Sequence, residues 1–223
     1  MAKLVWDQIG EHRYETGVDQ GVIYPLKADG TYDTGVAWNG LTQVTESPSG
    51  ADSNPFYADN IKYLDIRSAE EFGATIECYD YPDEFEVCNG RVAPVTGVTV
   101  GQQPRKGFGF VYRSIVGNDT EFNAHGYKLH LIYNATASPS EQSYATVSDS
   151  PEPGSMSFEV TTTPVVVTGF SSVKPTAQIT IDSTKVDSAV LTTLNNTLFG
   201  SDNSEPTLPD PATVLTMLGA TPG

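Results

Sequence analysis

"GFGFVYRSIV" (residues 107–116) and "GYKLHLIYNA" (residues 126–135) change side-chain character at every second position. In the first stretch Phe108, Phe110 and Tyr112 fall on one face, and the second alternates Tyr127, Leu129, Leu131 and Tyr133 with more polar residues. A period of two is typical of β-strands. The connection "GNDTEFNAHG" has the Gly, Asn and Asp content of a turn, so the two stretches predict one β-hairpin.

Similar alternation recurs along the chain. "GVIYPL" and "GVAWNGLTQV" flank Asp29-Gly30 and predict a second strand–turn–strand unit. Further strands are expected at Ile61–Ile66, Phe72–Tyr79, Val98–Gln102, Met156–Thr163 and Thr176–Ile181. Short strands at this spacing predict a mostly-β fold, a two-sheet sandwich or barrel.

Helical patterns are rare. Residues 184–199 predict one flanking helix, with a capping-box-like start at Thr184 and Asp187 and a stop at Gly200. A shorter helix is expected to begin at "PDEFEV", with Pro82 at its start. Residues 201–223 are Pro-rich and lack a clear period, so they predict a C-terminal extension that becomes ordered on meeting a partner.

A long polar connection, residues 46–60, contains two adjacent aromatic residues, Phe56 and Tyr57. An irregular connection of this length is uncommon in a compact domain and is usually functional or disordered. Either it folds back as an Ω-loop, or it leaves its own domain and lies on a neighbouring molecule. Two extended arms of about seven residues each reach ~20–25 Å. We favour the second interpretation, because a long detour for self-packing costs loop entropy without other benefit.

Composition limits the class of function. The 28 acidic and 12 basic residues give a net charge of −16, which argues against a stationary nucleic-acid binder. The first residues lack the apolar region of a signal peptide, and no run approaches the ~18 apolar residues of a membrane span, so we expect a cytoplasmic product. Cys78 and Cys88 are then expected to be free thiols, although a disulfide stays possible if the mature particle leaves the cell.

Catalytic motifs are missing. The three histidines have surface or hydrogen-bonding roles as the simplest interpretation, and the cysteine spacing does not suit a zinc site. "DGTYD" at Asp29 is better explained by a turn than by a calcium loop, and the acids of "YDYPDEFE" cluster locally instead of facing each other across a cleft. We therefore expect no catalytic residue, no cofactor and no metal.

The chain resembles the major tail proteins, or tail tube proteins, of long-tailed siphophages of Gram-positive hosts. The resemblance runs from about residue 4 to residue 200 and rests on the order and spacing of six blocks. They are "LVWDQIGEHRYETGV", "GVAWNGLTQVTESPSGADSNPFYADNIKYL", "EEFGATIECYDYPDEFEVCNG", "QPRKGFGFVYRSIVGND", "GYKLHLIYNA" and "PTAQITIDSTKV".

The resemblance implies a tail tube domain over residues 1–200, with two packed sheets, a flanking helix and extended terminal arms, followed by the extension 201–223. Copies would form hexameric rings that stack into a tube in the virion tail, assembled in the host cytoplasm, through which DNA passes without specific binding. The implied partners are other copies, a tape measure protein inside the lumen, and the tail terminator and distal tail protein at the ends. No membrane is involved.

Two further expectations follow for a tube. Acidic residues would line the lumen and repel DNA over a screening length of ~8 Å. The long connection would supply inter-subunit contacts through Ser47, Pro48, Asn54, Pro55, Phe56 and Tyr57.

Two other classes stay open. A carbohydrate- or receptor-binding sandwich would need solvent-facing aromatic residues arranged as a platform, and Trp6 and Trp38 are few for that purpose. A hydrolase would need a cleft with perturbed carboxylates.

Overall fold

The two alternating stretches form the predicted hairpin in the computed structural model, which describes residues 3–146, 149 and 153–223. β11 (Phe108–Asn118) and β12 (Phe122–Ala137) pair antiparallel. Pairs such as Val111↔Leu131 and Ile115↔Tyr127 set the register. Because cross-strand pairs on one face stabilise a sheet, these long strands form the backbone of the fold.

The main sheet continues on both sides of this hairpin. β1 (Arg13–Pro25) pairs with the free side of β11, and the short β2 (Val36–Trp38) pairs with β1. On the other side the order is β12, β13 (Met156–Thr162), β8 (Gly73–Cys78) and β3 (Leu41–Glu46). β14 (Gln178–Asp182) also pairs with β12. All of these pairings are antiparallel, which confirms the mostly-β class.

Two strands share one edge of β12, and the sheet bends where they meet. β14 pairs with Lys128–Ile132, whereas β13 pairs with Ala135–Ala137. Between them lies Asn134, whose φ of 47° is the left-handed conformation that Asn adopts more readily than most residues. The expected two sheets are therefore the two halves of one continuous, bent sheet.

Two apolar cores lie on opposite faces of the half that β1, β11, β12 and β14 form. The first core is enclosed between the two halves and is rich in aromatic rings; it includes Trp38, Phe85, Phe108, Phe110 and Phe158. The second core lies between the sheet and the helices and includes Tyr24, Leu129, Leu131, Tyr133, Ile181, Leu194 and Leu198. Gly21 brings β1 close to β3 near the first core, because a Cβ at this position would overlap the Leu41 side chain.

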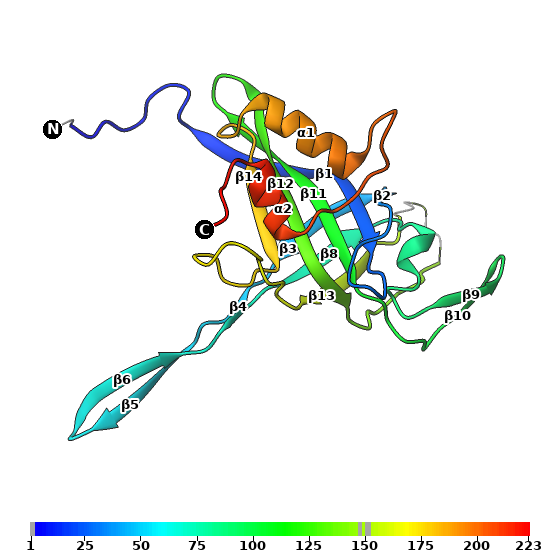
Figure 1. Ribbon diagram of the computed structural model, residues 1–223. Helices are drawn as coiled ribbons and strands as arrows, with labels where there is room; N and C mark the ends of the chain where they lie inside the picture. Colours follow the sequence, from blue (N-terminus) through cyan, green and yellow to red (C-terminus); the bar gives the residue numbers. More distant parts are fainter. Residues whose placement is uncertain (1–2, 147–148, 150–152) are drawn as a thin grey trace.

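Two helices cover the second core, as Figure 1 shows. α1 (Ser188–Phe199) begins later than predicted, because Asp187 and not Thr184 caps it by accepting hydrogen bonds from the backbone N–H groups of Ala189 and Val190. Its buried residues are Leu191, Leu194 and Leu198. The Tyr24 hydroxyl donates to the carbonyl of Leu198 and fixes the helix end to β1.

The C-terminal segment is ordered on the domain without a partner, contrary to the expectation for residues 201–223. α2 (Pro211–Met217) has Asp210 as its N-cap and buries Val214 in the second core. Leu208, just before the helix, is also buried. None of the described helices is long and apolar enough to span a membrane.

The "PDEFEV" stretch forms a 3₁₀ turn, η1 (Asp83–Phe85), instead of a regular helix. Its function is to place Phe85 in the first core, where the ring lies 4.6 Å from that of Trp38 and 4.9 Å from that of Phe158. The predicted unit around Asp29-Gly30 is correct for β2 but wrong for Leu41–Glu46, which pairs with β8 at the far edge of the sheet.

Three short two-stranded ladders project from this body. They are β4 (Ser49–Gly50) with β7 (Glu70–Glu71), β5 (Ser53–Ala58) with β6 (Ile61–Arg67), and β9 (Val92–Val95) with β10 (Val98–Val100). The first two follow each other along one long hairpin, visible at the lower left of Figure 1. The expectation of an irregular loop at 46–60 is therefore wrong: most of it is paired strand.

Candidate functional site

The long hairpin, residues 47–71, is the most conspicuous surface of the chain, and we call it the β5–β6 arm. Every residue from Ser47 to Glu71 is exposed. The arm begins where the backbone N–H of Ser47 donates to the carbonyl of Gly73 at 2.8 Å. A two-stranded hairpin is at best marginally stable in water without a covering surface. The arm therefore has the form of an element that another molecule covers.

The six predicted contact residues fall into two groups on this arm. Ser47 and Pro48 lie at its root, beside the main sheet. Asn54, Pro55, Phe56 and Tyr57 lie on β5, well away from the body. Phe56 is 52% exposed and Tyr57 is 71% exposed, so neither ring packs on its own domain. The folded-back Ω-loop is therefore not observed.

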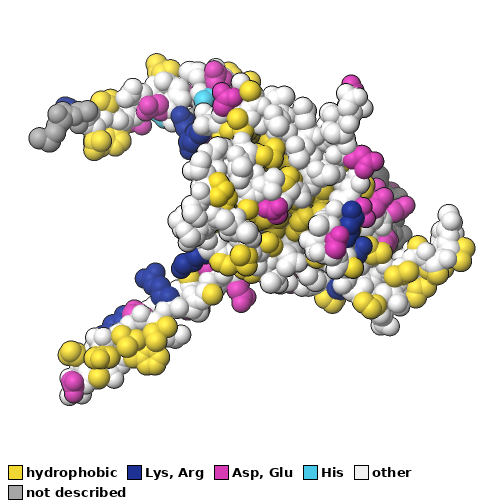
Figure 2. All heavy atoms as spheres, viewed as in Figure 1, with side chains coloured by type: hydrophobic (Ala, Val, Ile, Leu, Met, Phe, Trp, Pro, Cys, Tyr) yellow, Lys and Arg dark blue, Asp and Glu magenta, His cyan; other side chains and the backbone are white. Residues whose placement is uncertain are grey.

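The pairing of β5 with β6 divides the arm into two faces. Phe56 opposes Leu64 and Asn54 opposes Ile66, which puts Phe56, Leu64 and Ile66 on one face. On the other face Asp65 accepts hydrogen bonds from Ser53 and Lys62, both at 2.5 Å. Figure 2 shows the apolar side chains gathered towards the far end of the arm.

Several apolar residues of the arm were missed by the sequence reasoning about its contacts. Ile61, Tyr63, Leu64 and Ile66 are all exposed, and they come from a stretch expected only as a strand. The available signal was the adjacency of "NPFYADNIKYLDI", in which a short polar turn separates two apolar stretches. The exposed apolar surface is therefore larger than two rings.

A polar cluster anchors the root of the arm to the main sheet. Glu46, the last residue of β3, accepts hydrogen bonds from Tyr112 at 2.7 Å and Gln178 at 2.5 Å, and its Oε1 lies 3.1 Å from His130 Nδ1. These partners come from β11, β14 and β12. Hydrogen bonding by His130, opposed by desolvation and aided by Tyr112 and Gln178, lowers the pKa of Glu46 to about 2.

The same cluster includes a serine. Ser114 Oγ lies 2.9 Å from His130 Nε2, so serine, histidine and carboxylate follow in the order used by serine hydrolases. Here, however, the carboxylate is shared with two further donors, and the Tyr112 ring stacks on the imidazole at 4.5 Å and 3°. We interpret the cluster as a structural tie between the arm and the sheet.

The N-terminal segment is a second exposed arm. Leu4, Val5, Trp6 and Ile9 are all exposed, and Figure 1 shows this segment extending away from the sheet. Its root is held at the β11–β12 turn, where the Gly10 N–H donates to Asp119 at 2.9 Å and His12 Nδ1 lies 3.0 Å from Asp119. This contact with Asp119 raises the pKa of His12.

The β9–β10 hairpin is a third projection, on another side of the molecule. Its exposed apolar side chains are Val92, Val95, Val98 and Val100. Three projections with exposed apolar residues are unusual for a protein that acts as a monomer, because such patches commonly mark interaction sites.

Besides the terminal strands β2 and β3, two strands leave an edge of the main sheet open among the described residues. β14 hydrogen-bonds to β12 alone, and the part of β1 from Arg13 to Asp19 pairs with β11 alone. An open edge presents unpaired backbone groups to a strand of another chain. β14, β12, β11 and β1 form a four-stranded block between these edges.

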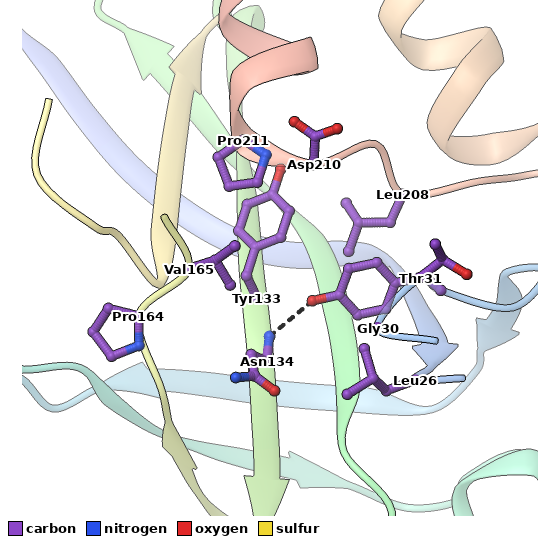
Figure 3. Close-up of a pocket in the computed structure, with 11 residues that line it drawn as sticks. Leu26, Gly30, Thr31, Tyr133, Asn134, Pro164, Val165, Leu208, Asp210 and Pro211 are labelled. Carbon is purple, nitrogen blue, oxygen red and sulfur yellow. Dashed lines mark hydrogen bonds between the residues drawn. The ribbon is translucent and has the colours of Figure 1, made fainter. Parts of the chain in front are cut away.

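A mostly apolar hollow of about 450 Å³ is shown in Figure 3. It lies between the turn after β1, the end of β12 and the segment before α2, and it includes Leu26, Tyr32, Tyr133, Val165 and Leu208. Tyr32 accepts a hydrogen bond from the Asn134 N–H at 2.9 Å, and Asp210 is engaged in capping α2. The buried Tyr133 hydroxyl, by contrast, has no hydrogen-bond partner among the described residues. This single unpaired group does not define a ligand, and we assign none to the hollow.

Three further observations concern possible metal ligands, the cysteines and Trp38. The described part of the chain contains no cluster of three or more His, Cys, Asp or Glu residues that could hold a metal ion. Cys78 and Cys88 are buried free thiols, and burial raises the pKa of Cys78 to about 11 and of Cys88 to about 12. Trp38 is buried in the first core, so it cannot form part of a surface platform with Trp6.

Comparison with known proteins gives only distant similarities. No family model matches the sequence, and no curated protein matches it. Among solved structures, one similar chain comes from the six-fold symmetrised cryo-EM structure of the anti-feeding prophage baseplate, with 8% identity and a TM-score of 0.37, over 83% of this chain and 100% of that one. Another belongs to the sheath–tube complex, in its extended state, of an extracellular contractile injection system (PVC). It has 13% identity and a TM-score of 0.31, over 80% of this chain and 94% of that one. Similarity at this level does not establish a family.

Proposed function

We propose that the chain is a structural subunit of a phage tail tube, the role implied by its sequence resemblance. Hexameric rings of the subunit stack into a tube with a negatively charged lumen, through which DNA passes during ejection. The tube belongs to the virion tail and is assembled in the host cytoplasm. Its other partners are the tape measure protein in the lumen and the terminator and distal tail proteins at the ends.

The observation that carries the proposal is the fully exposed β5–β6 arm. It holds six exposed large apolar side chains, namely Phe56, Tyr57, Ile61, Tyr63, Leu64 and Ile66. Full burial of one such side chain contributes about 1.5–3 kcal/mol. Exposure of these side chains to water is therefore unfavourable. A neighbouring copy that buried them would be bound more tightly by several kcal/mol of free energy.

Strand directions in the four-stranded block suit a ring. β14 is antiparallel to β12, β12 to β11 and β11 to β1, so β14 runs antiparallel to β1. Rotation about a ring axis does not change a strand's direction along that axis. The open β14 edge of one copy can therefore form an antiparallel ladder with the open β1 edge of the next, and head-to-tail contacts of this kind close into rings.

The arms would then act between rings. Contacts from one ring to the next are not closed by rotation, so they propagate as a tube until another protein stops them. An arm that projects far from the four-stranded block can reach across such a boundary. The contact residues Ser47, Pro48, Asn54, Pro55, Phe56 and Tyr57 belong to this proposed interface.

The polar end of the block, where Glu15, Lys128, Asp182 and Lys185 line a shallow hollow, bears on DNA passage. Lys128 forms an ion pair with Glu15, and Lys185 lies 3.0 Å from Asp182. Lysines neutralised by carboxylates do not release phosphate counterions and so bind DNA weakly. These pairs are neutral, so the repulsion of DNA that we propose comes from the net charge of −16 per copy and not from the paired residues themselves.

Electron microscopy of concentrated protein, with light scattering on the same sample, tests the proposal. We expect hollow tubes or six-fold rings from the wild type. The double variant Phe56→Ala/Tyr57→Ala should fold with an unchanged melting temperature but stay monomeric. Tyr79→Ala, which removes an exposed aromatic ring from the body, serves as the matched control.

A compact monomer that persists even with added tail-tip extract would contradict the tube role. Normal tubes from the double variant would instead contradict the role of the arm. A carbohydrate- or receptor-binding module is the alternative, and binding on a glycan array by a strictly monomeric protein would favour it.

A further inference from the structure

Among the residues that the structure describes, ion pairing leaves one partly buried cation without a carboxylate partner. Six of the twelve Lys and Arg residues lie within 4.0 Å of a carboxylate: Lys27, Lys62, Arg91, Arg113, Lys128 and Lys185. The other six, all in the described part of the chain, are Lys3, Arg13, Arg67, Arg105, Lys106 and Lys174. Five of them are exposed, and only Arg105 is half-buried.

Arg105 lines a polar hollow at the base of the β9–β10 hairpin. The hollow measures about 610 Å³ and is bounded by residues 89–91, 101–103, 105, 139, 140 and 142. Nη1 of Arg105 donates to the side-chain oxygen of Asn89 at 3.1 Å and to the carbonyl of Ala137 at 3.0 Å. Both acceptors are neutral, so they orient the guanidinium without compensating its charge.

A second guanidinium lines the same hollow. Arg91 donates to Gln142 at 2.7 Å and to Tyr81 at 3.3 Å, and its nearest carboxylate, that of Glu86, is 3.9 Å away. Two arginines and the amides of Gln103 and Gln142 thus face one cavity in a chain of net charge −16. This is a local reversal of the overall charge.

A partly buried charge without a counterion is costly, and removal of water from it would increase that cost. The planar guanidinium matches a carboxylate with two parallel hydrogen bonds. A chain with 28 acidic residues presents carboxylates on every neighbouring copy. We propose that this hollow, the Arg105 site, receives a carboxylate side chain of a second copy of the chain during assembly.

The adjacent hairpin supports a protein partner over a free anion. β9 and β10 leave the body directly from Arg91 and return to Gly101, so the four exposed valines continue from the rim of the hollow. A neighbouring copy could therefore cover the valines and place its carboxylate in the hollow at once. This inference rests on the proposed self-assembly.

Assembly of Arg105→Gln tests the site, with Lys106→Gln as the matched control, because both changes remove one positive charge from adjacent positions. The readout is the concentration at which tubes or rings first form, followed by light scattering and electron microscopy. Loss of one partner from a buried charge pair weakens an interface strongly, so we expect at least a tenfold rise for Arg105→Gln. Lys106→Gln should stay within about twofold of the wild type, since exposed charges contribute little.

Each outcome separates the two proposals. Failure of the wild type to assemble would contradict the proposed function itself, whereas assembly with equal thresholds for both variants would overturn the Arg105 site alone. If circular dichroism shows that Arg105→Gln does not fold, Arg105→Lys decides, since it keeps the charge but loses the two-pronged geometry. We expect at least a threefold rise for that variant, and a wild-type threshold would overturn the proposal.

Ligand titrations of the monomer, below its assembly threshold, distinguish the sources of the anion. Sodium glutarate mimics an acidic side chain, and a single-stranded oligonucleotide represents a polyanion. Arg105-dependent binding of the oligonucleotide would overturn the assignment to a carboxylate. Arg105-dependent stabilisation by glutarate, with assembly unaffected by Arg105→Gln, would identify a free-anion site and overturn the second-copy assignment.

Discussion

Replacement of Glu46 by glutamine should destabilise the protein at neutral pH and matter little in acid. Glu46 closes the polar cluster at the root of the β5–β6 arm, where Tyr112, Gln178 and His130 all contact its carboxylate. An uncharged amide cannot accept these bonds with the same strength, because hydrogen bonds to an ionised group are roughly twice as strong as neutral ones.

The size of the effect follows from the pKa of Glu46, which is lowered from 4.5 to about 2. One pKa unit corresponds to about 1.4 kcal/mol, so the full contribution would be about 3 kcal/mol. The side chain is 31% exposed, and solvent screening reduces such contributions. We therefore expect Glu46→Gln to lower the free energy of unfolding by about 1.5–2 kcal/mol at pH 7.

The pH dependence has a definite sign. Because the folded-state pKa lies below the ordinary value, the stabilisation is fully present above about pH 4.5 and is lost as the pH falls towards 2. The wild type and the variant should thus converge in acid. Urea unfolding between pH 7 and pH 2.5 measures the difference in free energy of unfolding between the two proteins. Glu70→Gln is the control, because Glu70 is an exposed carboxylate on β7, the other strand at the root of the arm.

Two results would refute this reasoning. A variant as stable as the wild type at pH 7 would mean that the hydrogen bonds to Glu46 do not stabilise the ionised form. A gap that stays constant down to pH 2.5 would mean that the loss comes from packing and not from the charge.

Three further predictions concern the cores and the thiols. Leu194→Ala should lower the free energy of unfolding by about 2–5 kcal/mol, because it leaves a cavity in the second core. Thr193→Ala, on the exposed face of α1, should change it by less than about 1 kcal/mol. Urea unfolding measures both. Val214→Asp should lower the melting temperature of the protein strongly and Thr216→Asp hardly at all, since only Val214 is buried; equal effects would contradict the packing of α2. Cys78 and Cys88 should react with a thiol reagent at pH 8 only after unfolding in urea, because burial raises both pKa values and blocks access; rapid labelling of the native protein would show that the buried placement is wrong.

Local periodicity was sufficient for the central strands. The β11–β12 hairpin followed from alternation and turn residues, because both its pairing and its burial depend on neighbours in sequence. The strand that pairs with Leu41–Glu46 could not be predicted from local periodicity. A turn rule suggested β1, whereas the sheet places this strand on β8, a choice set by packing of the first core over long sequence distances.

The arm and the C-terminal helix were missed for opposite physical reasons. Residues 53–58 contain Ser, Asn and Pro and resemble a loop, because a strand that is exposed on all sides does not need the buried pattern by which strands are predicted. α2 has only seven residues, too few for a periodic signal, and is held by contacts of Val214 and Leu208 with the sheet. The contact residues on β5 could be proposed from sequence, but Arg105 could not, since its lack of a counterion is a property of the fold.

The complete exposure of residues 47–71 also has an evolutionary consequence. Substitutions in this hairpin change almost no contact with the body, so selection for folding hardly acts on them. In the proposed assembly, selection acts on them through the contacts between copies. Arm sequences can therefore diverge, or be exchanged between lineages, while the two cores stay the same. If the chain assembles as proposed, two related assemblies in one cell would keep separate subunit pools through their arms alone.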